Sequence, residues 1–478
     1  MITSFNSFPK KKFHPEMNTN NHEFHPGILR EYDIRGIVGD TLSTADAYAI
    51  GRTFASIIGE SAASPRIATG FDGRLSSPEL ESELVRGLTD AGADVVRIGL
   101  GPTPMLYYTV HTLDLDGGIM VTGSHNPPDY NGFKLMRGKA GFFGADIIEF
   151  GKRSANGDWL ARDGLSNHHD VSESYLDCLL QDYTSDVSFK IAWDAGNGAT
   201  GDMLVRLTER LPGTHTLINT EIDGTFPAHH PDPTVPANLV QLQDAVAAGG
   251  LDLGIAFDGD GDRIGVVDGN GEILWADQLL ALFARDVLTQ FPGATIVADV
   301  KSSRILFDEI ARLGGNPLMW KTGHSLIKSK MAEVNAPLAG EQSAHIFFAD
   351  HYYGFDDALY VAVRLLDFIA LSGQSLAELR SELPSVLNTP ELRFPCPAER
   401  KLAVIEEVRA RLDKAGADVN VIDGVRVSSD EGWWLLRASN TQDVLVARVE
   451  ASSQAGLDRL KGELSDQIKA SGLAPPSI

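Results

Sequence analysis

The sequence predicts three consecutive, similar α/β domains with mainly parallel mixed sheets, followed by a C-terminal α+β domain, all placed around a central cleft. Three segments carry one pattern, in which an apolar strand ends in aspartate and leads through a polar or glycine-rich turn into an amphipathic helix and another strand. These aspartates are Asp72, Asp194 and Asp299. Their spacing of about 100 residues matches the size of a domain, and strand–helix–strand units predict parallel sheets with right-handed crossovers.

The pattern changes after Thr389, where a helix, short alternating strands and a closing helix predict an α+β domain. A chain of 478 residues is long enough for four such cores. The first residues are polar and lack the apolar core of a signal peptide, so we expect a loose leader, with Met17 as a second candidate for the start. The expected division is a flexible leader (1–26), α/β domains (27–170, 171–272 and 273–386) and an α+β domain (387–478).

Composition excludes several classes of protein. A net charge of -24 argues against nucleic-acid binding, which needs a basic face. The apolar stretches fall short of the roughly 20 residues that span a bilayer, so we expect no membrane contact. The only two cysteines, Cys178 and Cys396, favour neither a disulfide framework nor a cysteine metal site. We therefore expect a cytoplasmic protein, and a monomer.

Each of the three repeats contains a second apolar strand that ends in an unusual loop. GIMVT leads into GSHNPP, LGIAF leads into DGDGDR, and APLAG leads into EQSAH. Ligands of parallel α/β sheets bind beyond the carboxyl ends of strands. The three loops, which carry a candidate nucleophile, a carboxylate cluster and a Glu-Ser-His cluster, therefore predict three walls of one cleft.

The loop after GIMVT clamps Ser124 and His125 between glycine and two prolines. Such a loop is a stiff exit from a buried strand, and we expect an exposed serine there. An ordinary turn, in which Ser124 and Asn126 bond the local backbone, is the simpler interpretation of a lone Ser-His pair. The loop after LGIAF, however, favours a chemical role for Ser124.

That second loop places Asp258, Asp260 and Asp262 at alternate positions. Three adjacent carboxylates in a tight connection repel one another unless a cation lies among them, and oxygen ligands favour Mg²⁺ or Ca²⁺. A calcium EF-hand is excluded, because Arg263 and Gly269 stand where that motif requires glycine and glutamate. An acidic solvated turn is the remaining alternative.

A phosphorylated Ser124 would supply the ligand that such a Mg²⁺ site lacks. Mg²⁺ commonly keeps an open side for a phosphate oxygen. Lys134, His125 and Arg263 would then stabilise the charge on a transferring phosphoryl group. The residues therefore predict phosphoryl transfer.

Five motifs together resemble those of the α-D-phosphohexomutase superfamily, most closely its bacterial phosphomannomutase/phosphoglucomutase branch: REYDIRG, TGSHNPPDYNGFK, DGDGDR, GEQSAH and RASNTQDVLVARVEA. The resemblance covers nearly the whole chain in the expected order. It implies a phosphoserine enzyme of four domains around a central cleft. Such an enzyme interconverts the 1-phosphate and 6-phosphate of a hexose (mannose, glucose or both) through a bound 1,6-bisphosphate, with Mg²⁺ as cofactor and the bisphosphate as activator.

The resemblance also implies roles for individual residues. Ser124 resembles the phosphoserine of the family. Asp258, Asp260 and Asp262, together with Ser124, resemble its Mg²⁺ ligands. The expected catalytic residues are Ser124, Arg35, His125, Lys134, Arg263, His324 and His345. The expected substrate-binding residues are Tyr32, Lys301, Glu341, Ser343, Arg437, Ser439, Asn440 and Thr441. The last four resemble a clamp for the distal phosphate, and an arginine beside Ser, Asn and Thr in a tight loop suits an anion.

Plainer interpretations exist for several of these residues. Arg35 and Lys301 are alternatively surface charges, His324 a neighbour of a helix N-cap, and His345 a satisfied strand-end histidine. Surface solvation explains poorly, however, why six cationic or imidazole residues fall at strand ends of a chain with net charge -24.

Three alternative functions stay open at this point. The sugar loop GEQSAH departs from the usual sequence of the branch, and its glutamine favours a phosphoglucosamine mutase as the alternative activity. A metal-dependent phosphomonoesterase would discharge a phosphoserine to water, but does not need a separate clamp for a far phosphate. A non-catalytic sugar-phosphate binding protein leaves the three aspartates unexplained.

Overall fold

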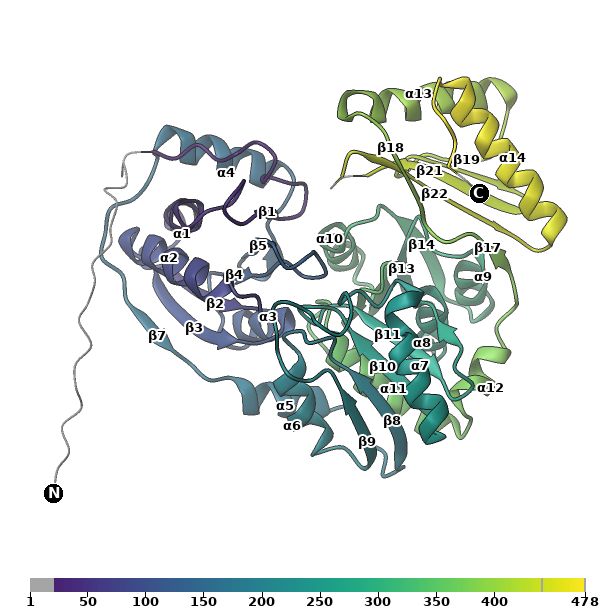
Figure 1. Cartoon of the computed structure of the whole chain (residues 1–478), viewed down its shortest axis with the longest axis horizontal. Helices are drawn as coiled ribbons and strands as arrows, with labels where there is room; N and C mark the ends of the chain where they lie inside the picture. The colour runs from purple at the N-terminus through teal and green to yellow at the C-terminus, as the bar shows by residue number, and fades with distance from the viewer. Residues whose placement is uncertain (1–20, 440–441, 477–478) are drawn as a thin grey trace.

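The computed structural model describes residues 21–439 and 442–476. They form three α/β domains and a fourth α+β domain, as the sequence predicts (Figure 1). Within the part of the chain that the structure describes, no helix combines the length and apolar character that a membrane crossing requires.

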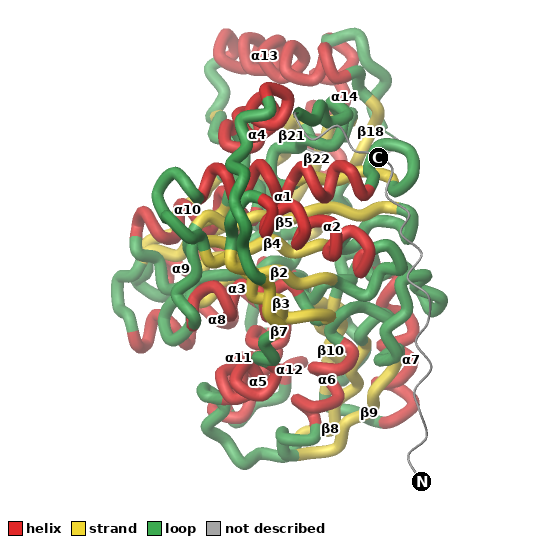
Figure 2. Tube along the Cα trace, turned by 90° about the vertical axis from the view of Figure 1, so that its left-hand side faces the viewer, coloured by secondary structure: helices red, strands yellow, loops and turns green. Residues whose placement is uncertain are grey.

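The first domain is built on a seven-stranded sheet of order β1-β5-β4-β2-β3-β7, with β6 beside β5. In Figure 2 the strands β5, β4, β2 and β3 lie one below another. The strands are β1 (Ile34–Ile37), β2 (Arg66–Phe71), β3 (Asp94–Leu100), β4 (Gly117–Val121), β5 (Tyr130–Arg137), β6 (Ala140–Gly141) and β7 (Ser166–His168). The helices are α1 (Thr44–Ile58), α2 (Ser77–Asp90), α3 (Thr103–Thr112) and α4 (Ala145–Asn156).

The last residues of the expected leader pack against this domain. Phe24 is 6% exposed, and its ring stacks on that of Phe150. His22 Nε2 lies 2.8 Å from Asp46 Oδ1, at the start of α1. These two residues of the expected leader therefore contact the first domain, because the aromatic ring of Phe24 packs on an apolar surface. Residues 1–20, which include Met17, lie outside the described residues.

The second domain contains a five-stranded sheet of order β12-β11-β10-β8-β9. Its strands are β8 (Phe189–Asp194), β9 (Gly213–Ile218), β10 (Leu253–Phe257), β11 (Ile264–Asp268) and β12 (Ile273–Leu274). Its helices are α5 (Ser172–Leu180), α6 (Gly201–Thr208), the 3₁₀ helix η1 (Pro236–Leu239) and α7 (Val240–Gly249). Because β12 pairs with β11, the second sheet extends past the boundary expected at residue 272.

The third domain contains a four-stranded sheet of order β14-β13-β15-β16. Its strands are β13 (Thr295–Asp299), β14 (Asn316–Trp320), β15 (Leu338–Gly340) and β16 (Ile346–Phe348). Its helices are α8 (Ala276–Gln290), α9 (Arg304–Arg312), α10 (His324–Val334), α11 (Ala358–Ser372) and α12 (Leu376–Ser381). The carboxylate of Asp357 caps α11 by accepting a hydrogen bond from the backbone N–H of Tyr360.

One topology recurs in these three sheets. A central strand (β2, β8 or β13) lies between two parallel neighbours. One of these neighbours (β4, β10 or β15) pairs on its other side with an antiparallel strand (β5, β11 or β16). The connection into that antiparallel strand is the serine loop (residues 122–129), the metal loop (258–263) or the sugar loop (341–345). The internal repeat in the sequence therefore places the three candidate loops at equivalent positions.

The fourth domain has an antiparallel sheet of order β17-β22-β21-β20-β19, with β18 also beside β22. Its strands are β17 (Leu387–Asn388), β18 (Leu392–Pro395), β19 (Val419–Asn420), β20 (Val425–Ser429), β21 (Gly432–Ala438) and β22 (Val444–Ala451). Its helices α13 (Ala398–Ala415) and α14 (Gln454–Ala470) pack with Trp434 and Leu436 in a core of their own.

The first three domains share one large apolar core. Alternate residues of each strand face opposite sides of its sheet, so Ile67 and Ile119 pack under α1 and α2. Ala68 and Met120 face the other side and join a cluster that includes Ile255 of the second domain and many residues of the third. On the opposite side of the fourth domain from its helices, Trp433 and Leu435 pack on Val300 of the third.

Candidate active site

The serine loop and the metal loop meet across the boundary between the first two domains. The Ser124 hydroxyl donates a hydrogen bond to Asp258 Oδ2 at 2.8 Å, and its oxygen lies 3.1 Å from His125 Nδ1. Ser124 is only 3% exposed, so the expectation of an exposed serine is wrong. The metal loop covers it, because Gly259 lacks a side chain and approaches the Ser124 carbonyl so closely that a Cβ would lie 2.4 Å from that oxygen.

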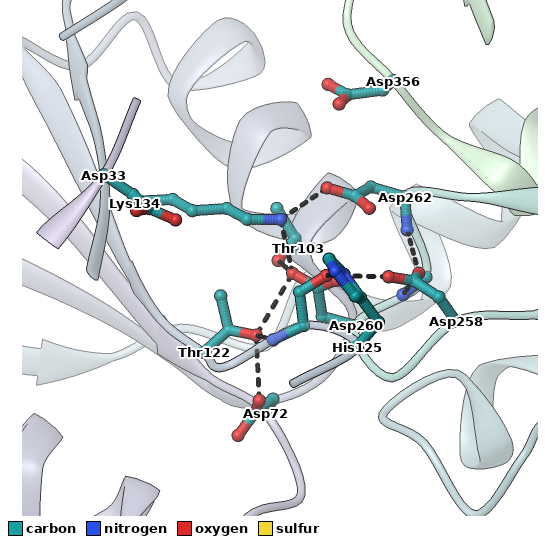
Figure 3. A network of polar contacts seen from close by, with 12 residues as sticks. Asp33, Asp72, Thr103, Thr122, His125, Lys134, Asp258, Asp260, Asp262 and Asp356 are labelled. Atoms are coloured by element: carbon teal, nitrogen blue, oxygen red, sulfur yellow. Dashed lines mark hydrogen bonds and ion pairs between the residues drawn. The ribbon is translucent and has the colours of Figure 1, made fainter. Parts of the chain in front are cut away.

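The three carboxylates of the metal loop are buried together, and each has different partners. Asp258 Oδ1 accepts hydrogen bonds from the backbone N–H groups of Gly261, Asp262 and Arg263. Asp260 Oδ2 accepts from Lys134 and from the Thr103 hydroxyl, and the Thr122 hydroxyl oxygen lies 3.2 Å from it. Asp262 Oδ2 accepts from Lys134 at 2.5 Å. Figure 3 shows Lys134 reaching from β5 toward Asp260 and Asp262.

These contacts push the pKa values of neighbouring groups apart. Burial, with the charges of Asp262 and Asp260, raises the pKa of Asp258 well above its usual value. Burial also favours the neutral form of Asp260, but the ammonium of Lys134 outweighs it and lowers the pKa of Asp260. For Lys134, burial is outweighed by Asp260 and Asp262, which raise its pKa well above the usual value. Lys134 is therefore a fixed positive charge.

The metal loop has the donors that a hard divalent cation requires. One oxygen from each of Asp258, Asp260 and Asp262 lies within 4.8 Å of the others. Asp260 Oδ1 and Asp262 Oδ1 are buried and accept no hydrogen bond from the described residues. Buried polar atoms without partners are rare and indicate a missing partner such as an ion, and all-oxygen ligation suits Mg²⁺. The three residues can therefore hold a metal.

The sugar loop reaches the metal loop through His345. Its Nε2 accepts a hydrogen bond from Arg263 Nε at 3.0 Å, and its Nδ1 lies 2.9 Å from Asp356 Oδ2. The ring of His345 stacks on that of His324, with 5.3 Å between centroids. Burial and Lys328 lower the pKa of His324 well below its usual value, so this imidazole is neutral.

Asp356 was not among the residues expected from the sequence. It precedes α11 beside the N-cap Asp357, where an acidic residue reads as part of a helix start. In the structure it is buried, accepts a hydrogen bond from Lys328 Nζ at 2.8 Å, and faces both His324 and His345. Asp262, His345 and Asp356 form a second group with metal-ligand spacing. Lys328 and Arg263 contact this group, and it shares Asp262 with the metal loop.

Arg35 lies beside the serine loop, and His125 belongs to it. Arg35 on β1 donates to Asn126 Oδ1 and to Asp33 Oδ2, each at 2.5 Å. Burial and the positive charges of Arg263 and Arg35 lower the pKa of His125 well below its usual value. The neutral imidazole beside Ser124 Oγ can accept a proton.

Four expected substrate-binding residues lie in or next to the third domain. Lys301 is 5% exposed and donates to Glu391 Oε2 at 3.0 Å. Glu341 accepts from the Gly323 backbone N–H at 2.6 Å, and burial raises its pKa. Ser343 is partly exposed on the sugar loop. Tyr32 comes from the first domain, and its hydroxyl donates to the Thr322 carbonyl at 2.7 Å.

The expected phosphate clamp lies at the end of β21. Arg437 is 5% exposed and donates from Nε to Asp423 Oδ2 at 3.0 Å. The same carboxylate oxygen accepts from the Thr322 backbone N–H, which ties the clamp to the third domain. Asp423 outweighs burial and raises the pKa of Arg437. The Ser439 N–H donates to the Val444 carbonyl, while Asn440 and Thr441 lie outside the described residues.

A cavity of about 420 Å³ separates the first domain from the third. Its lining includes three of the expected site residues, Tyr32, Lys134 and His324. The remaining lining combines small and aliphatic residues with aromatic and basic side chains, among them Tyr107, His111, Lys139, Lys328, Tyr353 and Phe355. The Lys134 ammonium and the neutral His324 ring therefore border open space.

Four family profiles match consecutive parts of the chain. Their descriptions are phosphoglucomutase/phosphomannomutase alpha/beta/alpha domain I (residues 27–149), domain II (173–271), domain III (275–387) and C-terminal domain (391–467). The four matches follow the four sheets of the structure, apart from the short strands β7 and β12, which lie between matches, and β17, which lies at the end of the third match.

The chain is similar along almost its whole length to named proteins. It is 44% identical over 445 residues to a phosphomannomutase/phosphoglucomutase of Pseudomonas aeruginosa, covering 93% of this chain and 96% of that one. It is 43% identical over 447 residues to a phosphoglucomutase of Neisseria gonorrhoeae, covering 93% and 97%. A crystal structure of a phosphoglucomutase/phosphomannomutase family protein from Burkholderia thailandensis matches with a TM-score of 0.89 and 41% identity, covering 95% and 99%.

Proposed function

The chain belongs to the phosphoglucomutase/phosphomannomutase family, and on that basis we propose that Ser124 is the residue that receives and returns the transferred phosphoryl group. The enzyme is a phosphohexomutase that interconverts the 1-phosphate and 6-phosphate of a hexose (mannose, glucose or both) through a phosphoserine enzyme and a 1,6-bisphosphate. The observation that carries the assignment of Ser124 is its hydrogen bond to Asp258, beside two buried carboxylate oxygens without hydrogen-bond donors among the described residues.

Asp258, Asp260 and Asp262 would hold Mg²⁺, with an oxygen on Ser124 as a further ligand. The ion supplies positive charge that stabilises the transferring phosphoryl group. The buried, partnerless oxygens of Asp260 and Asp262 support this role. We also infer that a hexose 1,6-bisphosphate activates the enzyme, because an unphosphorylated Ser124 must acquire its phosphate from a donor.

In one half-reaction a sugar hydroxyl attacks the phosphorus on Ser124. The new bond joins phosphorus to the sugar oxygen, the bond between phosphorus and Ser124 Oγ breaks, and the proton of the sugar hydroxyl passes through a base to Ser124 Oγ. In the other half-reaction Ser124 Oγ gives its proton to a base and attacks a phosphorus of the bisphosphate, the bond between that phosphorus and the sugar oxygen breaks, and the sugar oxygen takes up the proton. Asp258 Oδ2 and the neutral His125 ring are the acceptors within hydrogen-bond distance of Ser124 Oγ in the described structure.

The cations around Ser124 hold the phosphoryl group during transfer. Lys134 and Arg35 come from the first domain and Arg263 from the second, so they can contact different phosphoryl oxygens. His345 orients Arg263 through its Nε2, and His324 packs against His345. Charge spread over three oxygens in the transition state is stabilised by such preorganised donors.

The other expected residues would bind the sugar and its far phosphate. Glu341 and Ser343 would accept and donate hydrogen bonds to ring hydroxyls, while Tyr32 and Lys301 would line the pocket. Arg437, Ser439, Asn440 and Thr441 would hold the phosphate that is not reacting. Arg437 donates from Nε to Asp423, and the two terminal nitrogens of a guanidinium suit the oxygens of such a phosphate.

The chain division, assembly and location are proposals as well. We keep the four expected domains, with the second extended through Leu274 because of β12. A monomer is supported by the fact that loops of one chain build the whole candidate site. A cytoplasmic location is supported by Cys178 and Cys396, which are buried and unbridged within the described chain.

The sugar loop supports phosphoglucosamine mutase as the alternative activity, because Gln342 follows Glu341 directly. A metal-dependent phosphomonoesterase is the alternative of another class. The burial of Ser124 disfavours it, since water has little access to a phosphate on this oxygen.

One incubation separates these functions. The protein is mixed with mannose 1-phosphate, Mg²⁺ and a trace of glucose 1,6-bisphosphate, and the products are identified by ³¹P NMR. The 6-phosphate isomer is expected. Free phosphate would instead indicate a hydrolase, an unchanged substrate would indicate a binding protein, and exclusive turnover of glucosamine phosphate in a parallel reaction would favour the glucosamine enzyme.

A further inference from the structure

The guanidinium of Arg74 lies inside the serine loop and is almost completely buried, with 1% exposure. Its Nη2 donates to the carbonyls of Ser124 (2.7 Å) and Asn126 (2.6 Å). Its Nη1 donates to the carbonyls of Pro127 (2.5 Å) and Tyr130 (3.0 Å). A guanidinium has five N–H groups in a rigid fork, and the fifth, on Nε, points to Asp72 Oδ2 at 3.2 Å. One side chain thus binds three backbone carbonyls of the serine loop and the carbonyl of Tyr130, the first residue of β5.

Asp72 holds the start of the same loop by accepting hydrogen bonds from N–H and hydroxyl groups of the loop. Its Oδ2 accepts from the Gly123 backbone N–H at 3.1 Å and from the Thr122 hydroxyl at 2.8 Å. Its Oδ1 accepts from Ser77 and from the Arg74 backbone N–H. The loop is therefore held by acceptors on one side and donors on the other, and both partners belong to the turn that follows β2.

The loop needs this support because its nucleophile has an unfavourable backbone conformation. Ser124 has a φ of 48°, in the left-handed region that residues with a Cβ avoid. Such conformations persist only where the surrounding structure over-determines them. Gly123 permits the close approach, since a Cβ at that residue would lie 2.4 Å from Arg74 Nε.

The second domain closes over the guanidinium. The ring of Phe226 lies 5.1 Å from Arg74 Cζ, a cation–π distance. Gly224 packs so closely that a Cβ there would lie 2.6 Å from Arg74 Cα. The group that holds the serine loop is therefore itself held by the domain that carries Asp258.

We propose that Arg74, paired with Asp72, is a positioning residue for phosphoryl transfer: it holds Ser124 in the left-handed conformation in which Oγ meets Asp258. This inference rests on the proposed role of Ser124 as the phosphoserine. Each half-reaction uses the same Oγ, so the loop must present the phosphorus at one place whether Ser124 is phosphorylated or free. All five N–H groups of Arg74 bond Asp72 or backbone carbonyls, so Arg74 would act through the loop backbone.

The test compares Arg74→Lys with Arg52→Lys. A lysine retains the charge and can pair with Asp72, but its single nitrogen cannot reach four carbonyls. Arg52 is a matched control, because it is a buried arginine of the same domain that donates to a backbone carbonyl, that of Leu160, away from the serine loop. Each protein is phosphorylated with glucose 1,6-bisphosphate and mixed rapidly with glucose 1-phosphate, and the loss of phosphate from Ser124 is followed by intact mass.

We expect Arg74→Lys to slow this single turnover by about 100-fold or more, since misplacement by about 1 Å can cost that much, and Arg52→Lys to slow it less than about threefold. The Kd of glucose 1-phosphate for each dephosphorylated protein, measured by calorimetry, should change less than about threefold. Hydrogen exchange should accelerate in residues 122–130 of Arg74→Lys alone. Equal turnover rates in the two variants, or a Kd that weakens as much as the rate falls, would overturn the proposal.

A second variant keeps the test decisive if Arg74→Lys does not fold. Phe226→Leu leaves Arg74 in place but removes the aromatic face above it, and should slow the single turnover by about threefold to tenfold with an unchanged Kd. An unaltered rate would count against the role of Arg74. Absence of phosphate on Ser124 of the wild-type protein would instead refute the proposed function, which separates the two failures.

Discussion

The hydroxyl of Ser124 and the carboxylate of Asp258 lie 2.8 Å apart, although they are separated by 134 residues and belong to different domains. The contact joins two loops that occupy the same position in two copies of one topology. Because both residues are buried, neither loop can take this geometry without the other. The nucleophile and its charged partner are therefore assembled only when the two domains dock.

Ser124→Ala should abolish most turnover while the fold stays intact, because the substitution removes only one hydroxyl from the serine loop. The intact mass of active wild-type enzyme should show one added phosphate that the variant lacks. Ser154→Ala is the control, since Ser154 is a buried serine of the same domain on α4. Full activity of unphosphorylated wild-type protein without any bisphosphate would show that the covalent assignment is wrong.

Asp260→Asn should weaken Mg²⁺ binding and slow phosphoryl transfer by about two orders of magnitude or more, because one of three charged ligands is lost. EDTA should inhibit the wild type reversibly. Asp268→Asn serves as control: Asp268 is also buried in the second domain, but its oxygens accept from backbone N–H groups and Arg380. Undiminished wild-type activity in EDTA would contradict the metal assignment.

Arg437→Ala should raise KM for the 1-phosphate and the 6-phosphate substrates together, since Arg437 would hold whichever phosphate is not reacting. A hydrogen bond to a charged group contributes about 1.5–3 kcal/mol, so the rise should be about 10-fold to 100-fold. The exposed Arg409 of the same domain gives the control variant, Arg409→Ala. A defect confined to one direction would show that the clamp binds only one orientation of the sugar.

Glucose and mannose phosphates should both react, with kcat/KM within about a factor of 100 of each other. The bisphosphate must turn by about half a rotation between half-reactions. Glu341 and Ser343 can therefore bond ring hydroxyls that exchange places on turning, whereas the configuration at C2 is only weakly recognised. An epimer that forfeits no buried hydrogen bond should cost less than about 3 kcal/mol. Steady-state kinetics on both sugars tests this, and a ratio above about 10⁴ would contradict it.

His111 should make the fold acid-sensitive. Burial, with the charges of Lys139 and Lys328, lowers the pKa of His111 to about 4. An unfolded histidine titrates near about 6.5, so between these values the unfolded chain binds more protons and stability falls as the pH decreases. His111 packs on Tyr353 and Phe355, and His111→Phe preserves that contact. The loss of unfolding free energy between pH 7.5 and pH 5, from urea titration, should be smaller in the variant than in the wild type or in a control at exposed His168.

The fold class and the loops that form the site could be predicted because both depend on local pattern. The strands that precede Ser124, Asp258 and Glu341 are short apolar runs, and the parallel topology then brings their ends together. The roles of individual residues remain predictions. They follow from the motifs rather than from any bound ligand.

Other features depend on contacts between segments far apart in the chain. Arg74 stands 50 residues before Ser124, in a stretch that reads as a polar turn before a helix. Asp356 reads as part of a helix start, and its contact with His345 requires the third sheet to be in place. The burial of Ser124 and of Phe24 likewise depends on contacts with distant segments, which the local sequence pattern does not predict.

The distribution of apolar cores has a consequence for how the molecule melts. One cluster runs through the first three domains, whereas the fourth has a separate core. The fourth domain joins the third through the small cluster of Trp433, Leu435 and Val300 and through polar contacts of Arg426 with backbone carbonyls. Cooperative unfolding follows shared cores, so calorimetry should resolve a transition of the fourth domain from a joint transition of the other three. A bisphosphate bound to both parts stabilises each only while they stay together, and it should therefore draw the two transitions into one.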